Sequence, residues 1–158
     1  MSDPRTLKRM SIFEDLTEKE LSEVAPLCEV KHFAKGQTLF LEDRPALQLF
    51  VLQEGRVVIM MNGAHGHRAM VYTVQPGQAF SWSALVPPKK YTASAIAVEP
   101  AETIVVNGRK LARLFKQDAS LGYKVMCRIA QLVSKRLRHT RLQLLNIHDW
   151  HPPEQEKS

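Results

Sequence analysis

The sequence contains only two cysteines, Cys28 and Cys127, and they lie far apart along the chain. Two widely separated cysteines form neither a disulfide framework nor a zinc site, and they exclude a four-cysteine iron–sulfur cluster within one chain. Long apolar runs are also missing, since none approaches the roughly 18 residues of a membrane-spanning helix. The N-terminus lacks a basic segment followed by an apolar stretch, so it does not read as a secretory signal. We therefore expect a cytoplasmic protein that does not associate with membranes.

The overall composition is that of a folded protein, with 44% hydrophobic and 24% charged residues. Such values are ordinary for globular domains and argue against disorder throughout the chain. A chain of 158 residues can bury one sizeable core, and no second large domain fits beside it.

Acidic residues are nearly absent from residues 108–145, where Asp118 stands alone against ten Lys and Arg, a net charge of +9. By contrast, residues 1–107 carry a net charge of −1 and residues 146–158 a net charge of −2. The positive charge of the protein therefore belongs to its C-terminal helical segment. Such a patch can attract an acidic protein partner or nucleic acid, although a solvated helix face would look the same.

Residues 1–27 are interpreted as an N-terminal helical segment. Thr17 and Glu20 form a capping-box pattern, in which Thr17 caps the helix and Glu20 reaches back to it. Apolar residues then recur at helical spacing at Leu21, Val24, Ala25 and Cys28.

Residues 28–107 change to short strands separated by turn residues at intervals of roughly ten. Apolar runs at 47–52, 57–60, 69–74 and 103–106 are the clearest strands. A tight hairpin is expected at Glu54-Gly55-Arg56, and another turn at Asn62-Gly63. The pattern predicts a mainly β fold with flanking helices, a β-roll or double-stranded jelly roll.

Residues 108–148 return to helical spacing, with a short helix over Arg109–Lys116 and a long one over Ala119–Ile147. One face of the long helix, suited to packing on the strands, holds Leu121, Val125, Ile129 and Leu132. A second face alternates steps of four and three, as a partner-helix seam does; it comprises Met126, Ala130, Val133, Leu137, Thr140, Leu144 and Ile147. We therefore expect a homodimer through residues 126–147, followed by a flexible tail over 149–158.

This order of elements resembles the cyclic-nucleotide-binding domain of the catabolite activator protein and fumarate–nitrate regulator superfamily, over about residues 7–147. The resemblance is carried by Phe33–Phe40, which looks like the opening strand pair with its turn glycine, and by Leu49–Val57, Pro76–Phe80, Ala93–Glu99 and the Arg136-Leu137/Thr140-Arg141 pattern. The family's regulators carry a DNA-reading domain after this module, whereas only about ten residues follow the long helix here. The resemblance therefore implies a stand-alone sensor module, not an enzyme, without specific DNA binding.

In the family, a short helix presents N–H groups to the cyclic phosphate, an Arg neutralises that phosphate and a Glu binds the ribose. The chemistry is reasonable because helix N-termini attract anions and Arg binds phosphate bidentately. In the alignment implied by Phe80 and Ala93-Ser94, Trp82 stands at the Glu position and Tyr91 at the Arg position. Both charges are missing, although Lys89 or Lys90 could supply a cation.

The candidate ligand site combines three segments that the resemblance brings together. They are the ligand cassette, which starts at Phe80 and includes Ser81–Ala84, a wall expected to be a strand over residues 90–92, and the long helix. Two positions of that helix match base-contacting residues of the catabolite activator protein. The candidate residues are Phe80, Ser81, Trp82, Ser83, Ala84, Lys90, Tyr91, Thr92, Arg136 and Thr140. The implied ligand is cyclic AMP, cyclic GMP or another small anion; otherwise Trp82 and Tyr91 fill the pocket and no ligand binds.

Two histidine patterns in the sequence are candidate metal sites. His65-Gly66-His67 resembles a cupin motif, but residues 68–76 contain no acid to complete it, so an exposed hairpin is favoured. His148, Asp149 and His151 lie near the chain end, and two histidines there are too few for a zinc site. Cys127 on the long helix is interpreted as a small buried hydrophobe, and no metal or catalytic residue is predicted.

Two functions follow from these observations. The first is a ligand-sensing regulatory module with a degenerate cassette, which signals through ligand-dependent movement of the long helix or through a partner protein. The alternative is a structural or protein-interaction module with a closed pocket, whose basic helix binds an acidic partner.

Overall fold

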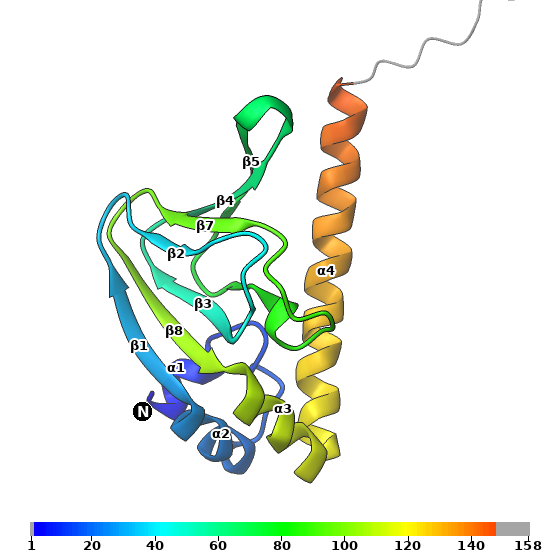
Figure 1. The fold of residues 1–158 in the computed structure, drawn as a ribbon. Coiled ribbons are helices and arrows are strands. Elements are labelled where there is room, and N and C mark those ends of the chain that lie inside the picture. Colours follow the sequence, from blue (N-terminus) through cyan, green and yellow to red (C-terminus); the bar gives the residue numbers. More distant parts are fainter. Residues whose placement is uncertain (1, 148–158) are drawn as a thin grey trace, which may run out of the picture.

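The computed structural model describes residues 2–147 (Figure 1). The chain begins with helices α1 (Pro4–Lys8) and α2 (Glu18–Val24) and the 3₁₀ turn η1 (Ala25–Leu27). Eight strands follow within the described part: β1 (Cys28–Phe33), β2 (Thr38–Phe40), β3 (Gln48–Glu54), β4 (Val57–Asn62), β5 (Arg68–Val74), β6 (Ala79–Phe80), β7 (Ser94–Ala97) and β8 (Ala101–Asn107). The 3₁₀ turns η2 (Ala64–Gly66) and η3 (Trp82–Ala84) interrupt them, and helices α3 (Gly108–Gln117) and α4 (Ala119–Ile147) complete the order.

The strands form two four-stranded antiparallel sheets, in the orders β1-β8-β3-β6 and β2-β7-β4-β5. The pairs β1–β8, β2–β7, β3–β6 and β4–β5 are those of a long hairpin folded over itself, which is the jelly-roll arrangement. The predicted fold class is therefore confirmed, including the short and the long C-terminal helix.

The turn at Gly55 corrects one prediction, because it is not a hairpin. It joins β3 to β4, and these strands belong to different sheets. Gly55 has φ +90°, and a Cβ there would overlap the carbonyl oxygen of Pro100 and lie 2.8 Å from Cα of Ala101. Similarly, β1 and β2 are not paired with each other. A sequence pattern identifies a turn, whereas tertiary packing decides which sheet each strand joins.

The turn at Asn62-Gly63, in contrast, belongs to a hairpin that joins the paired strands β4 and β5. The Gly63 N–H donates a hydrogen bond of 2.6 Å to the His67 carbonyl. His65 and His67 are exposed at this tip, as the sequence predicted. Among the described residues no group of three or more His, Cys, Asp and Glu side chains could hold a metal ion; the pattern at 148–151 lies outside those residues.

The N-terminal segment is helical, but its second helix is shorter than predicted. The capping box is present, with the Glu20 N–H donating to Thr17 Oγ1 and the Thr17 N–H donating to Glu20 Oε2. The helix ends at Val24. The helical spacing predicts Cys28 on its apolar face, but Cys28 is the first residue of β1. Burial raises the pKa of the Cys28 thiol to about 12, so this side chain is an inert part of the core.

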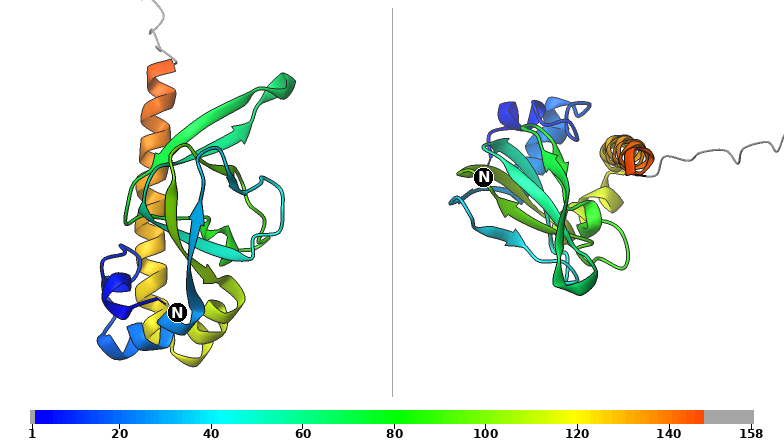
Figure 2. Two further views of the ribbon diagram at one scale, coloured as in Figure 1. Left: turned by 90° about the vertical axis from the view of Figure 1, so that its left-hand side faces the viewer. Right: turned by 90° about the horizontal axis from the view of Figure 1, so that it is seen from above.

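Helix α4 packs on the roll with the predicted face, since Leu121, Val125, Ile129 and Leu132 are buried. It runs along one side of the roll and continues to the end from which the β4–β5 hairpin projects (Figures 1 and 2). On the predicted seam, Met126 is half-buried against the core, whereas Ala130, Val133, Leu137, Thr140 and Leu144 are exposed. The side chain of Ile147 and the predicted tail lie outside the described part. The structure contains no helix within the described residues that could span a membrane.

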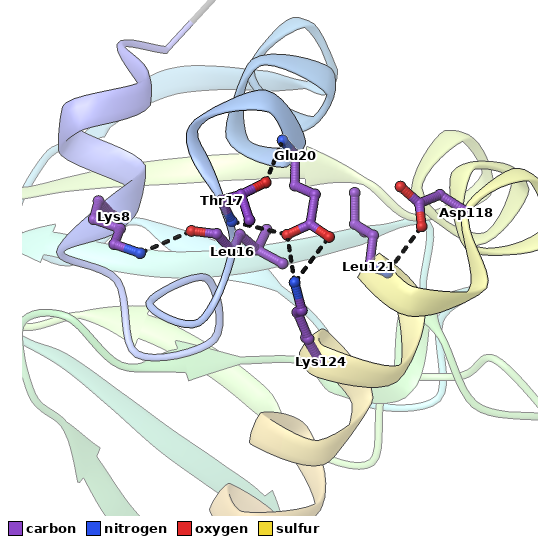
Figure 3. A network of polar contacts seen from close by, with 7 residues as sticks. All are labelled: Lys8, Leu16, Thr17, Glu20, Asp118, Leu121 and Lys124. Atoms are coloured by element: carbon purple, nitrogen blue, oxygen red, sulfur yellow. Dashed lines mark hydrogen bonds and ion pairs between the residues drawn. The ribbon is translucent and has the colours of Figure 1, made fainter.

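Acidic residues of the N-terminal segment neutralise part of the basic long helix. Glu20 accepts hydrogen bonds of 2.9 and 3.0 Å from the Lys124 ammonium group, as Figure 3 shows. Arg128 donates bidentately to Asp15 and pairs with Glu14. Two of the cations assigned to a possible partner surface therefore hold the N-terminal segment on α4.

Candidate functional site

The ligand cassette begins at the end of β6 with a left-handed residue. Ser81 has φ +65° and precedes η3, a single 3₁₀ turn that stands where a short helix was expected. The Ser81 hydroxyl donates a hydrogen bond of 3.0 Å to the Gln48 carbonyl of β3, which fixes the cassette to the sheet. The cassette is thus anchored by a polar side chain, and its turn is too short to build a helix dipole comparable to that of an α-helix.

The wall after the cassette is a loop, not the strand that was expected over residues 90–92. Lys90 forms only an isolated bridge to Pro45, and β7 begins at Ser94. The Tyr91 N–H donates to the Arg44 carbonyl at 2.9 Å, and the Tyr91 carbonyl accepts from the Asp43 N–H at 2.8 Å. These bonds clamp the main chain of Tyr91 to the preceding loop without continuing a sheet.

Tyr91, at the family's Arg position, is a core residue. Its side chain is 7% exposed and its ring stacks on Phe40, with centroids 4.1 Å apart and planes 17° apart. Its hydroxyl lies 3.5 Å from the Gln48 carbonyl, at the limit of hydrogen-bond length. Burial raises the pKa of Tyr91, so its hydroxyl stays neutral. Lys89 and Lys90 next to it are exposed.

A cavity of about 140 Å³ lies between the cassette, the loop at 91–93 and the β4–β5 hairpin. Four of the predicted site residues line it: Ser81, Trp82, Tyr91 and Thr92. The other lining residues were not predicted: Phe40, Ile59, Met61, Val71, Tyr72 and Ala93. Ile59 and Met61 could have been found, because residues two apart on a strand share one face.

The remaining predicted site residues do not line this cavity. Phe80 is fully buried in the core of the roll, and Ala84 lies beneath Gly108, where a Cβ would be 3.1 Å from that of Ala84. Lys90 and Thr140 are exposed. Ser83 and Arg136 are half-buried outside the lining. The predicted site is therefore only partly assembled.

Arg136 nevertheless reaches the cavity wall from α4. Its guanidinium carbon lies 3.6 Å from the centroid of the Tyr72 ring, and its Nη2 donates a hydrogen bond of 2.9 Å to Gln78 Oε1. Its Nε is buried without a partner among the described residues. Burial lowers the pKa of Arg136 and raises that of Tyr72. A second contact joins the same elements, because Gln143 Nε2 donates to the Val71 carbonyl at 3.4 Å. Helix α4 therefore contacts two neighbouring residues that line the cavity.

The cavity is small and uncharged in this state. Pockets for drug-sized ligands measure about 300–1,000 Å³, whereas this cavity measures about 140 Å³. None of its described lining residues carries a formal charge. A phosphate placed here would lose part of its hydration without a cation to compensate, which costs several kcal/mol.

In the described part of the chain, four larger hollows, of about 870, 590, 550 and 190 Å³, lie away from the cassette. One, of about 870 Å³, is bordered by α1, the loop after it and the start of α2; another, of about 590 Å³, lies beside α3. None of the four contains a cassette residue. We therefore place the candidate site at the smaller cavity, where the family's ligand cassette lies.

The jelly roll with its cassette and long helix defines a ligand-binding regulatory fold, and comparisons with known proteins identify the family. The family described as cyclic nucleotide-binding domain matches residues 30–118, so the chain belongs to this family. A solved structure from Geobacter metallireducens GS-15, assigned as a cyclic nucleotide-binding protein, is 32% identical and covers 87% of this chain and 99% of its own, with a TM-score of 0.79.

Two curated relatives are similar over part of their length. The cGMP-dependent protein kinase 2 of Homo sapiens is 28% identical over 94 residues, which are 59% of this chain and 12% of the kinase. The CRP-like cAMP-activated global transcriptional regulator of Mycobacterium tuberculosis (strain CDC 1551 / Oshkosh) is 21% identical over 141 residues, 89% of this chain and 61% of the regulator. The chain thus spans less than two thirds of either curated relative.

Proposed function

We propose that the chain is a regulatory sensor module with a degenerate ligand cassette, in which α4 responds to the state of the cavity. One observation carries the proposal: Tyr72 lines the cavity, and its ring is covered by Arg136 of α4. A ligand that moves Tyr72 would change the contact between the Tyr72 ring and Arg136 and, through Arg136, the position of α4. The role is one of binding and transmission, not catalysis.

The ligand need not be the cyclic nucleotide that appears in the names of the curated relatives. Those names mention cGMP and cAMP, and a cyclic nucleotide or another small anion is the expectation from family membership. A cyclic nucleotide is larger than this cavity of about 140 Å³, so it would have to enlarge the cavity or extend beyond it into solvent. A cation would also have to move in from outside the lining.

An alternative function is a structural or protein-interaction module with a closed pocket. The packing of Tyr91 favours it, because an aromatic residue occupies the place of the phosphate-binding Arg. An acidic partner would then dock on the exposed cations of the basic helical segment that have no ion pairs among the described residues: Arg109, Lys110, Arg113 and Lys116 of α3 and Lys135, Arg138 and Arg141 of α4.

Hydrogen exchange of α4 tests the sensor function without a ligand. Tyr72→Leu removes the aromatic ring under Arg136, whereas Tyr72→Phe keeps the ring and serves as the matched control. A cation–π contact contributes about 0.5–2 kcal/mol, so we expect exchange in residues 133–146 to be about 2- to 30-fold faster in Tyr72→Leu. Tyr72→Phe should match the wild type. Equal exchange in all three proteins would mean that α4 does not respond to the cavity wall, and would favour the closed-pocket module.

A further inference from the structure

The lining of the cavity is apolar and aromatic. Of its ten residues, eight are aliphatic, aromatic or thioether side chains, and only Ser81 and Thr92 are small and polar. Four rings face it, those of Phe40, Tyr72, Trp82 and Tyr91, and Met61 adds a polarisable sulfur. Aromatic rings and thioethers bind flat apolar groups by offset stacking and sulfur–aromatic contacts.

Two hydroxyl groups at the cavity, those of Ser81 and Tyr91, are already directed at the main chain. The Ser81 hydroxyl donates its proton to the Gln48 carbonyl, and the Tyr91 hydroxyl is directed at the same oxygen. The guanidinium of Arg136 is held by Tyr72 and Gln78 outside the lining. An anionic ligand would therefore find no cation in the lining. Its donors would be limited to the Tyr72 and Thr92 hydroxyls and the Trp82 indole N–H, which have no hydrogen-bond partners among the described residues, whereas an uncharged apolar ligand needs none.

The size of the cavity matches one aromatic ring. It measures about 140 Å³ and is partly open to solvent; in volume it is close to the enclosed apolar cavity of about 150 Å³ that accommodates benzene or xenon in a protein core. Met61 and Thr92 line the cavity and are also exposed, which leaves a route from solvent. We propose that this cavity binds an uncharged, apolar molecule about the size of a single aromatic ring. The proposal rests on the sensor function and names the class of its ligand.

Methionine-methyl NMR with benzene as the probe tests this directly. Met61 lines the cavity, whereas Met70 on the paired strand is 63% exposed and does not line it, so one sample contains both the reporter and its control. We expect benzene to shift the Met61 methyl signal saturably and to leave Met70 unchanged. Benzoate, which adds a charge to the same ring, should bind at least about tenfold more weakly.

Two variants keep the test specific. Ala93→Leu fills the cavity from its wall, and Thr92→Phe covers it from an exposed position, so the second remains informative if the first fails to fold. Each should abolish the saturable shift of Met61, whereas Ala130→Leu on the exposed side of α4 should preserve it. The proposal would be overturned by any of three results: benzoate binds as tightly as benzene, the Met61 shift persists in both variants although they are folded, or the wild type does not bind benzene.

The outcome is separable from that of the sensor function. If benzene does not bind but the α4 exchange still depends on residue 72, the sensor function stands with a different ligand. If the exchange does not depend on residue 72, the sensor function fails whether or not benzene binds.

Discussion

Single residues decide the character of the cavity. Trp82 and Tyr91 stand where the family resemblance places a Glu and an Arg, and Tyr91 has become part of an aromatic cluster with Phe40, Phe50 and Phe80. Lys90, the nearest cation along the chain, is exposed and does not line the cavity. Under the proposed function, these two residue types make the cavity apolar at the positions where the resemblance implies charges.

At this scale we predict weak binding of cyclic nucleotides. Loss of a charge-assisted hydrogen bond to the phosphate costs about 1.5–3 kcal/mol, which corresponds to about 10- to 150-fold lower affinity than with the Arg present. The double variant Trp82→Glu/Tyr91→Arg should unfold at a lower temperature than the wild type, because it buries an unpaired cation at position 91. Cyclic AMP should restore part of that stability and bind more tightly to the double variant.

Calorimetry measures the affinity for cyclic AMP, and thermal unfolding measures the stability. The control is Lys90→Arg, at an exposed position outside the cavity, which should change neither the affinity nor the unfolding temperature. Submicromolar affinity of the wild type for cyclic AMP or cyclic GMP would contradict the prediction. It would mean that Lys90 or another group has taken the role of the missing Arg.

At the scale of elements, every turn between successive strands except the β4–β5 hairpin directs the chain into the other sheet. Gly36 and Gly55 both have positive φ, but only Gly55 lies against another segment of backbone, at Pro100 and Ala101. Gly36 has no neighbouring atom within 4 Å of an added Cβ. The two glycines therefore separate the effect of backbone conformation from that of close approach.

We predict that Gly55→Ala is more destabilising than Gly36→Ala. A side chain in the left-handed region costs about 1–2 kcal/mol, which both variants share. Overlap with the backbone at residues 100–101 adds about 1–3 kcal/mol in Gly55→Ala alone. Denaturant unfolding of the two variants measures the difference directly, and equal losses of free energy would show that the roll relaxes around the new methyl group.

The docking of α2 on α4 gives a prediction for pH. Burial opposes ionisation of Glu20, but hydrogen bonds from the Thr17 N–H and Lys124 prevail and lower the pKa of Glu20 below its ordinary value of 4.5. A lowered carboxyl pKa stabilises the fold above the unfolded-state value, and this stability is lost as the pH falls through the folded-state value. Arg128 lowers the pKa of Asp15 in the same direction, foremost through its hydrogen bonds.

Glu20→Gln should therefore lower the free energy of unfolding by about 1–3 kcal/mol at pH 7. The difference from the wild type should shrink as the pH falls below the ordinary value of 4.5 and disappear at lower pH, where Glu20 is protonated in both states. Urea unfolding across this range measures it, with Glu54→Gln as the control because Glu54 is exposed. A difference that persists unchanged at acidic pH would show that the charge of Glu20 is not its source.

For the whole molecule, the outward side of α4 is more apolar than a monomer requires. Val133, Leu137 and Leu144 are 37%, 49% and 55% exposed along the predicted seam. Their spacing of four and seven residues suits a second copy of the same helix. We infer a homodimer through this seam.

Leu137→Glu should dissociate this homodimer. Burying one Leu contributes about 1.5–3 kcal/mol, and a two-fold interface counts the residue twice, so the dimer should weaken by roughly 10²- to 10⁴-fold. Leu142, also 49% exposed but off the seam, provides the control Leu142→Glu, which should remain a dimer. Light scattering of the purified proteins measures the mass, and a wild-type monomer in the tens of micromolar would contradict the prediction.

The sequence by itself determined the elements whose cause is local. The capping box at Thr17, the positive-φ turns at Gly36 and Gly55 and the span of α4 follow from periodicity and backbone preference within a few residues. The sequence also places Trp82 and Tyr91 at the two positions where the family resemblance implies charged residues. These features need no knowledge of distant contacts.

Tertiary structure alone decided how distant residues meet. It assigned β3 and β4 to opposite sheets, buried Tyr91 against Phe40, placed Arg136 over the Tyr72 ring and paired Lys124 with Glu20. The walls of the cavity come from β2, β4, β5 and the loops at 81–82 and 91–93, which are far apart in the sequence. Such contacts depend on the packing of whole elements, which local patterns do not encode, and they set the size and charge of the site.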